Sequence, residues 1–422
     1  MKKVELLAPA GDLDKLKVAF NYGADAVYIG LKSFSLRANS GNFSDDEYIE
    51  GLEYAHNLNK KLYIALNIYF TPEQSEELIE RLNFLNINRP DGLIVSDLGT
   101  IYLIKKTAPE IPIHISTQAN TTNGYSAQFY LEAGATRIVL ARELSLKQIK
   151  AVKDICNIEL EAFVHGAMCI AYSGRCLLSS YMTSTSLGSR NTMPDPYPRS
   201  ANKGDCSHSC RWEYTIKETQ RHDQEFPIEE DKYGSYVLSS KDICMIEHIP
   251  SMIEAGIDSL KIEGRMKSIL YTSSIVRAYR DAIDAYYENR PFDRSFIENE
   301  LNVVSHREFS TGFFFDNPIN NPQLTAGGIY SREMRLVGMI TKDYDKYHGI
   351  KIYNKISEND NLEIISKGTI TAPIGRIVFF DKEGKQYHEA RHCDERFCII
   401  YDINGKPIEL NEYDIIRSYT KF

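Results

Sequence analysis

The sequence contains no long apolar run and no excess of positive charge. None of its 422 residues lies in a stretch that approaches the roughly 18 uncharged apolar residues of a membrane span, and Glu5 and Pro9 interrupt the start before a signal-peptide core can form. We therefore expect a cytoplasmic protein that does not associate with membranes. The formal net charge of −9 argues against sequence-independent nucleic-acid binding, which depends on Lys and Arg neutralising phosphates.

Several common catalytic motifs are also missing. The chain has no Gly-x-Ser-x-Gly or glycine-rich phosphate-binding motif, so the usual signatures of serine hydrolases and nucleotide-binding proteins are absent. Cysteine is scarce, at eight residues, but four of them lie in two short pairs. Without an export signal disulfides are not expected, so paired thiols indicate a metal or an iron–sulfur centre.

The two pairs are Cys169/Cys176 and Cys206/Cys210. Four thiolates can hold a 4Fe-4S cluster if the connecting chain folds back on itself. Zinc is the alternative, but structural zinc sites favour gaps of about two to four residues, and the gap between Cys169 and Cys176 is longer. Cys244 could replace Cys210 as the fourth ligand. His165 precedes Cys169 closely enough to suggest a thiol nucleophile with a histidine base, although this leaves the other cysteines unexplained.

The first part of the chain alternates predicted strands and helices. Eight apolar segments have the pattern of buried strands: residues 4–10, 26–31, 62–68, 92–96, 111–117, 137–141, 159–163 and 259–262. Eight such units at about the length typical of the fold predict a TIM-type (β/α)8 barrel. A doubly wound open sheet is the alternative, because its helices would follow the same pattern.

Three parts are expected along the chain: a TIM-like barrel with the metal site in residues 1–290, an irregular linker in 291–330, and a small all-β barrel domain in 331–422. From residue 336 onward, short alternating stretches separated by Gly, Asn and Asp turns are typical of a small β-barrel or sandwich. Residues 184–206 are rich in Pro, Gly and Ser and predict a long loop. Its Arg190, Arg199 and Lys203 could contact a phosphate backbone, or simply face solvent.

Polar residues follow most of the predicted barrel strands. In a TIM-type barrel the strand ends on the carboxyl side carry the active site, so these residues are expected to gather at one mouth. Asp97 and Asn120 could serve only as helix caps, whereas charged residues that flank buried strands need partners or a substrate. We predict catalytic roles for His165, Glu143, Arg142 and Glu263. We predict substrate-binding roles for Arg37, Asn67, Gln118, Asn120, Lys261 and Arg265, whose cations suit a small carboxylate-bearing co-substrate.

One stretch resembles a known family signature. Residues 161–179 read Glu-x-Phe-x-x-Gly-Ala-Met-Cys-x-x-x-x-Gly-x-Cys-x-Leu-Ser, which resembles the signature of the collagenase-like peptidases, family 32 of unknown mechanism. Residues 6–11, 25–28, 114–120 and 259–265 resemble the same family. The resemblance implies a 4Fe-4S cluster on four cysteines. Cys169, Cys176 and Cys206 match cluster positions, and either Cys210 or Cys244 supplies the fourth ligand.

The family members that this chain resembles most use prephenate as hydroxyl source and make 5-hydroxyuridine at the tRNA wobble position. Relatives hydroxylate ribosomal RNA or ubiquinone precursors without dioxygen. The resemblance therefore implies a tRNA hydroxylase that takes the anticodon loop, with prephenate as co-substrate and a partner protein of the same family as a further expectation. Two other hypotheses are a peptidase with Cys169 as nucleophile and a zinc-stabilised RNA- or protein-binding module.

Overall fold

A computed structural model of the chain describes most of its residues. The described residues are 3–35, 42–169, 173–176, 178–183, 199, 201, 206–211, 230–231, 234–235, 241–315, 334–344, 347–358, 360–392 and 394–419. They divide into two compact units, each built from several stretches. The first comprises residues 1–13, 25–266 and 307–330, and the second comprises 14–24, 267–306 and 331–422.

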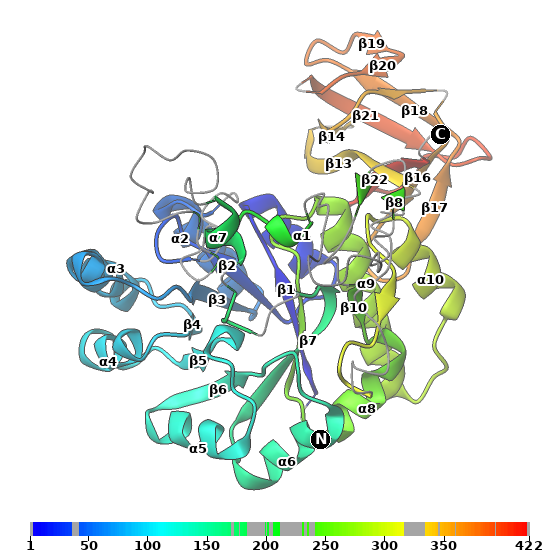
Figure 1. The fold of residues 1–422 in the computed structure, drawn as a ribbon. Helices are drawn as coiled ribbons and strands as arrows, with labels where there is room; N and C mark the ends of the chain where they lie inside the picture. The colour runs from blue at the N-terminus through cyan, green and yellow to red at the C-terminus, as the bar shows by residue number, and fades with distance from the viewer. Residues whose placement is uncertain are drawn as a thin grey trace. The chain divides into compact units, whose positions relative to one another are not determined.

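The first unit contains a closed barrel of eight parallel strands (Figure 1). In order of pairing these are β1 (Glu5–Pro9), β2 (Ala26–Gly30), β3 (Lys61–Leu66), β4 (Gly92–Val95), β5 (Ile113–Ile115), β6 (Ala135–Val139), β7 (Glu159–Ala167) and β11 (Ser259–Ile262). β11 pairs in parallel with β1 on one side and with β7 on the other, which closes the ring. The predicted TIM-type barrel is confirmed, and the open-sheet alternative is wrong.

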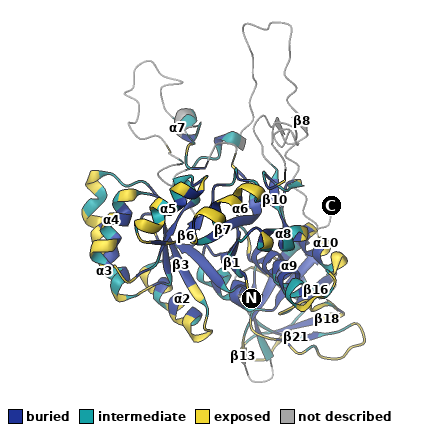
Figure 2. Ribbon diagram, turned by 90° about the horizontal axis from the view of Figure 1, so that it is seen from below, coloured by how far each residue is buried: buried dark blue, intermediate teal, exposed yellow. Residues whose placement is uncertain are grey.

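Helices follow the barrel strands and have exposed residues on their outer faces (Figure 2). Those of the first unit are α2 (Asp45–Asn57), α3 (Ser75–Ile87), α4 (Leu98–Thr107), α5 (Gly124–Glu132), α6 (Leu146–Ile155), α7 (Leu178–Thr183) and α8 (Ile249–Glu254). Short 3-10 turns are η1 (Pro72–Gln74), η2 (Thr117–Ala119), η5 (Ser209–Arg211) and η6 (Ile246–His248). The sequence dictates several starts: the predicted capping box at Ser44 and Glu47 is formed, and Asp97 caps α4. The capping interpretation of Asp97 is therefore confirmed.

Two short strands extend the sheet beside β7. β10 (Asp242–Cys244) runs antiparallel to the end of β7, and β12 (Phe309–Ser310) pairs with β10. The Arg307 guanidinium holds this addition in place through a buried ion pair with Asp242, 2.6 Å long. β7 therefore continues past its predicted end at residue 163, because β10 supplies a partner for its last residues. A separate hairpin joins β8 (Glu230–Asp231) and β9 (Gly234–Ser235).

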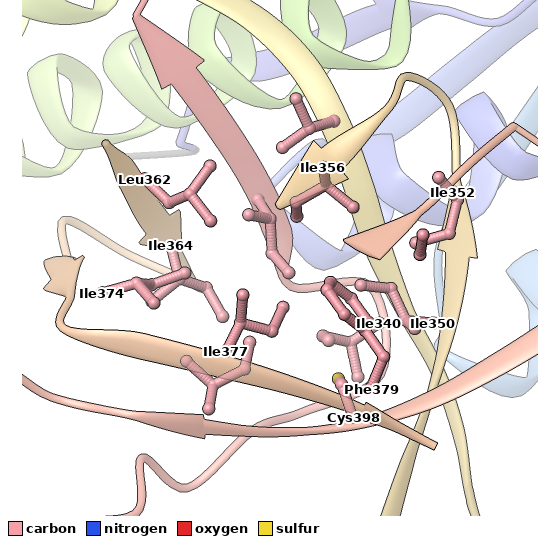
Figure 3. Packing of buried hydrophobic residues seen from close by; sticks show 14 of the residues in the cluster. Ile340, Ile350, Ile352, Ile356, Leu362, Ile364, Ile374, Ile377, Phe379 and Cys398 are labelled. Carbon is pink, nitrogen blue, oxygen red and sulfur yellow. The ribbon is translucent and has the colours of Figure 1, made fainter. Parts of the chain in front are cut away.

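The second unit is built on an eight-stranded antiparallel sheet. Its order is β17 (Thr371–Ile374), β16 (Leu362–Ile365), β22 (Ile415–Tyr419), β13 (Met334–Tyr344), β14 (Tyr347–Ile352), β21 (Glu395–Tyr401), β18 (Arg376–Phe380) and β19 (Gln386–Tyr387). β15 (Ile356–Ser357) pairs separately with β20 (Glu389–Ala390). Figure 3 shows the apolar core on this sheet, where Ile340, Ile364, Ile377 and Phe379 pack together.

Three helices belong to the second unit: α1 (Leu13–Asn21), α9 (Ile269–Glu288) and α10 (Arg294–Asn302). Arg417 on β22 is fully buried and pairs with Glu300 on α10 at 2.9 Å. Tyr22, just after α1, donates to the Ile365 carbonyl oxygen at 2.8 Å. The prediction that residues 291–330 are irregular is wrong for α10, which begins at an Asp293 cap and is held by a charge pair that no local pattern reveals.

Candidate functional site

The site that the sequence predicts lies at the carboxyl ends of the barrel strands. Its floor is aromatic: the Arg142 guanidinium lies 4.0 Å from the centroid of the Phe163 ring, and the Lys261 ammonium lies 4.3 Å from the Tyr28 ring. Phe163 and Tyr28 belong to one buried cluster of the barrel interior. Cations over aromatic faces are attracted by the ring quadrupole, so the strands themselves fix both charges.

Lys261 is one end of a series of buried ion pairs inside the barrel. Its Nζ donates to Glu161 at 2.7 Å, and the other oxygen of Glu161 accepts from Arg137 at 3.2 Å. Arg137 also pairs with Glu5 at 2.6 Å, at the opposite end of the barrel. Burial lowers the pKa of Lys261, and Glu161 opposes that shift. Lys261, which was predicted to bind substrate, is thus paired with Glu161 inside the barrel. The sequence analysis missed Arg137 and Glu5, although charges within buried strands could have indicated them.

Glu263 and Arg265 follow β11 and are both nearly buried. The Tyr28 hydroxyl lies 3.3 Å from Glu263 Oε2, and Arg265 Nη1 donates to the Ser35 hydroxyl at 2.8 Å. Gly30 makes room for this arginine: a Cβ there would lie 2.1 Å from Arg265 Nη1. The structure therefore supplies two fixed guanidinium groups after barrel strands, Arg265 after β11 and Arg142 after β6.

His165 lies on β7 and is buried, with 1% of its surface exposed. Its ring packs against Phe309, with 5.4 Å between the centroids. Its backbone carbonyl accepts from the Glu263 N–H at 2.9 Å. Cys169, by contrast, is exposed. The predicted catalytic histidine is therefore set into the wall of the barrel, whereas the thiol proposed as its nucleophile faces outward.

Glu143 and Ser173 are joined by hydrogen bonds at the carboxyl end of the barrel. One Glu143 oxygen accepts from the Ser173 N–H at 2.9 Å, and the other accepts from the Ser173 hydroxyl at 3.0 Å. Next to it, Gly174 has φ +72°, and a Cβ there would lie 1.9 Å from the Gln118 carbonyl oxygen. Both carboxylate oxygens of the predicted catalytic Glu143 thus hold the segment that leads to Cys176.

The remaining predicted substrate-binding residues occupy the same end of the barrel. The Gln118 carbonyl oxygen accepts from the Tyr69 hydroxyl at 3.0 Å, and the Asn67 carbonyl oxygen accepts from Ser96 at 3.2 Å. Asn120 adopts a left-handed conformation, and its buried Oδ1 has no hydrogen-bond partner among the described residues. Burial raises the pKa of Tyr69, and Arg175 opposes this. Arg37 lies outside the described residues.

The predicted metal ligands carry reduced thiols rather than disulfides. Cys169, Cys176, Cys206, Cys210 and Cys244 form no disulfide. Arg142 Nη1 lies 3.9 Å from Cys169 Sγ and donates to the Ala167 carbonyl oxygen at 3.2 Å. The donor chemistry fits a four-thiolate centre. Within the described ranges, no three His, Cys, Asp or Glu side chains are arranged to hold a metal ion.

The polypeptide nevertheless joins the two cysteine segments. The Ser207 N–H, next to Cys206, donates to the Ser179 hydroxyl at 2.9 Å, and that hydroxyl donates to the Arg199 carbonyl oxygen at 2.7 Å. Arg199 in turn donates to the Cys206 carbonyl oxygen at 3.3 Å. Arg199 is thus tied to the cysteine segments, whereas Arg190 and Lys203 of the same predicted loop lie outside the described residues.

Comparison with known proteins identifies the family. The family model described as "Peptidase family U32" matches residues 11–323. The chain belongs to peptidase family U32. A U32 relative of Bacillus subtilis, "tRNA hydroxylation protein P1", is 38% identical over 93% of this chain and 90% of its own length. "tRNA hydroxylation protein P" of Escherichia coli is 35% identical over 90% of this chain and 88% of its own. An "uncharacterized protease" of Methanocaldococcus jannaschii is 40% identical over 87% and 88%.

Several residues of the 161–179 stretch have structural roles in the barrel and its mouth. Glu161 and Phe163 build the charged interior and the aromatic floor, Gly166 has φ +98°, Gly174 allows the close approach to Gln118, and Ser179 joins the two cysteine segments. No helix within the described part of the chain is long and apolar enough to cross a membrane.

Proposed function

We propose that this chain hydroxylates tRNA and forms 5-hydroxyuridine at the wobble position, with prephenate as hydroxyl donor and a 4Fe-4S cluster on Cys169, Cys176, Cys206 and Cys210. One observation carries the proposal: relatives named for tRNA hydroxylation match along most of their own length and most of this chain. The cluster, the donor and the modified nucleoside are the specific parts of the proposal that experiments must test.

The mouth of the barrel supports this chemistry through binding and orientation. Arg142 and Arg265 carry guanidinium groups that can donate two parallel hydrogen bonds to a carboxylate, and prephenate carries two carboxylates. The Phe163 and Tyr28 rings are buried beneath the Arg142 and Lys261 cations and hold those charges in position. Enzymes that modify a base take it out of its stack, and a barrel mouth offers a pocket for it.

The four cysteines are the proposed ligands of the cluster. A 4Fe-4S cluster, when bound, supplies electron-transfer or Lewis-acid chemistry whose potential depends on hydrogen bonds and exposure around the sulfurs. Arg142 lies beside Cys169, so one residue adjoins both the proposed cluster and the proposed acid site. The buried His165 and the exposed Cys169 give less support to a cysteine peptidase.

The decisive experiment uses purified full-length protein and tRNA from a strain that lacks the gene. Anaerobically reconstituted protein with prephenate should convert the wobble uridine to 5-hydroxyuridine, measured by nucleoside mass spectrometry. Cys206→Ser should abolish the product, whereas Cys156→Ser is the matched control because Cys156 is buried at the end of α6, outside both pairs. Unchanged tRNA with the parent protein contradicts the proposal.

Two further measurements separate the alternatives. Brown protein with bound iron is expected, whereas colourless protein with one zinc per chain would favour the binding module. Gelatin cleavage that Cys169→Ala abolishes and Cys206→Ser preserves would instead establish the peptidase.

A further inference from the structure

The structure assigns Ser179 as a positioning residue: its hydroxyl is the joint that brings the segment of Cys206 to the segment of Cys176. The inference rests on the proposed four-cysteine centre for its purpose, but its geometry is independent of hydroxylation. It concerns how two stretches of chain that are distant in sequence reach one place.

The first step is that the Cys176 segment is anchored to the barrel. Ser173 is bound through both its N–H and its hydroxyl to the two oxygens of Glu143. The Thr117 hydroxyl lies 3.5 Å from the Ser173 hydroxyl, and Gly174 lies against the Gln118 carbonyl. These contacts come from the turns after β5 and β6. The residues just before Cys176 are therefore held in a fixed position at the carboxyl end of the barrel.

The second step is that α7 carries this anchor to Ser179. The helix spans Leu178–Thr183, and its first residue is two positions beyond Cys176, so Ser179 lies in its first turn. The Ser179 side chain is 1% exposed, and the Thr183 hydroxyl donates to the Ser179 carbonyl oxygen at 2.8 Å. A buried hydroxyl needs hydrogen-bond partners, and here those partners come from the second cysteine segment.

The third step is the joint itself. The Ser179 hydroxyl accepts the Ser207 N–H at 2.9 Å, lies 3.0 Å from the Ser207 hydroxyl, and donates to the Arg199 carbonyl oxygen at 2.7 Å. One hydroxyl thus contacts the residue next to Cys206 and the residue whose guanidinium binds the Cys206 carbonyl. A serine side chain is short and holds its partners close to the helix, so it sets the separation of the two segments.

Cross-linking of the metal-free protein tests the joint. A short bismaleimide should link Cys176 to Cys206. Trypsin cleaves after Arg175, Lys203 and Arg211, so the two cysteines lie on different tryptic peptides that only the cross-link joins. Ser179→Ala removes every contact of the hydroxyl and should lower the yield of this cross-link about fivefold, since buried hydrogen bonds are lost. Ser207→Ala leaves the Ser207 N–H in place and should lower it less. Ser179→Thr keeps a hydroxyl and should restore most of the yield.

The matched control is Ser145→Ala. Ser145 caps α6 through its hydroxyl, which contacts Gln148 of the same helix, so its removal should cost helix stability without changing the cross-link. Circular dichroism and thermal melting check that each variant folds. If Ser179→Ala does not fold, Ser207→Pro removes the N–H donor from the other side of the joint and must give the same loss.

Iron content after anaerobic reconstitution is the second measurement, and Ser179→Ala should hold less iron per chain than Ser145→Ala. A cross-link yield that is equal in Ser179→Ala and the parent overturns the joint, even if the parent modifies tRNA. A yield that depends on Ser179 in a protein that neither binds iron nor modifies tRNA supports the joint and contradicts the proposed function instead.

Discussion

Glu161 is completely buried between two cations, Lys261 and Arg137, inside the barrel. A buried carboxylate in this position neutralises charges that the strands would otherwise carry into a low-dielectric interior. This explains why a fully buried glutamate stands between apolar residues in the middle of β7. At the scale of the residue, the site therefore depends on charged side chains that are buried inside the barrel.

We expect Glu161→Ala to destabilise the protein by about 3–5 kcal/mol, because removing one partner of a buried ion pair leaves the other charge unpaired. The free energy of unfolding in urea measures the effect. The control is Glu308→Gln, which breaks the more exposed pair with Lys241 and should cost less than about 1 kcal/mol. Equal losses in the two variants would contradict the buried-charge account.

His114 gives a pH-dependent prediction. Its ring is buried against Tyr63, its Nδ1 has no hydrogen-bond partner among the described residues, and burial lowers its pKa well below 6.5. Below pH 6.5 the unfolded chain binds a proton that the folded chain does not. The contribution of His114 to stability is therefore present above pH 6.5 and declines as the pH falls toward the folded-state pKa.

The His114→Leu variant should remove that dependence. Between pH 6.5 and 5.5 the parent should lose up to about 1.4 kcal/mol more unfolding free energy than the variant. Urea unfolding at the two pH values measures the difference. Parallel profiles for the parent and His114→Leu would refute the assignment.

At the scale of the element, the segment 173–176 depends on how closely it lies to the turn after β5. Gly174 has both a left-handed conformation and a backbone carbonyl where its Cβ would be, whereas Gly384 has the same kind of conformation with no atom within 4 Å. Alanine substitutions at the two glycines therefore distinguish the cost of backbone strain, which both positions share, from the cost of a steric clash, which only Gly174 has.

Gly174→Ala should displace the segment and expose Cys176, while Gly384→Ala should cost only the strain of about 1–2 kcal/mol for a left-handed residue. The rate at which a maleimide alkylates Cys176, followed by peptide mass spectrometry, is the measurement. We expect a faster rate in Gly174→Ala and the parent rate in Gly384→Ala. An unchanged rate in both would show that Gly174 does not position Cys176.

At the scale of the whole molecule, the second unit is assembled from three separate stretches of chain. Residues from α1, α9 and α10 share buried polar contacts with the antiparallel sheet, including Tyr22 with Ile365 and Arg417 with Glu300. Arg277 on α9 likewise donates to the Ile370 carbonyl oxygen at 3.1 Å. The sheet is therefore part of the packing of helices that precede it in sequence.

A chain that ends at residue 330 should consequently be less stable than the full chain, because Tyr22, Arg277 and Glu300 would lose the sheet that pairs them. We expect a lower melting temperature and aggregation in size-exclusion chromatography. Melting at the temperature of the full chain, with a monodisperse profile, would show that the tail is an independent domain.

Local sequence patterns were sufficient to locate the barrel strands in order and to identify the two cysteine pairs. Apolar periodicity located all eight barrel strands, because burial on both faces leaves a continuous apolar run. The same reasoning missed α10, whose Glu300 is buried only because Arg417 reaches it from β22. It also did not detect that Lys261 is paired with Glu161, since the two residues lie on strands that are separated by a long stretch of chain.

The sequence by itself determined the alternation of strands and helices, the helix caps and the set of thiols, because each depends on neighbours within a few residues. Only the tertiary structure decided which charges neutralise one another inside the barrel, that Glu143 holds Ser173, and that Ser179 meets Ser207. Those contacts join residues that are close only after the ring of strands has closed. A pattern along the chain cannot encode the distance between them.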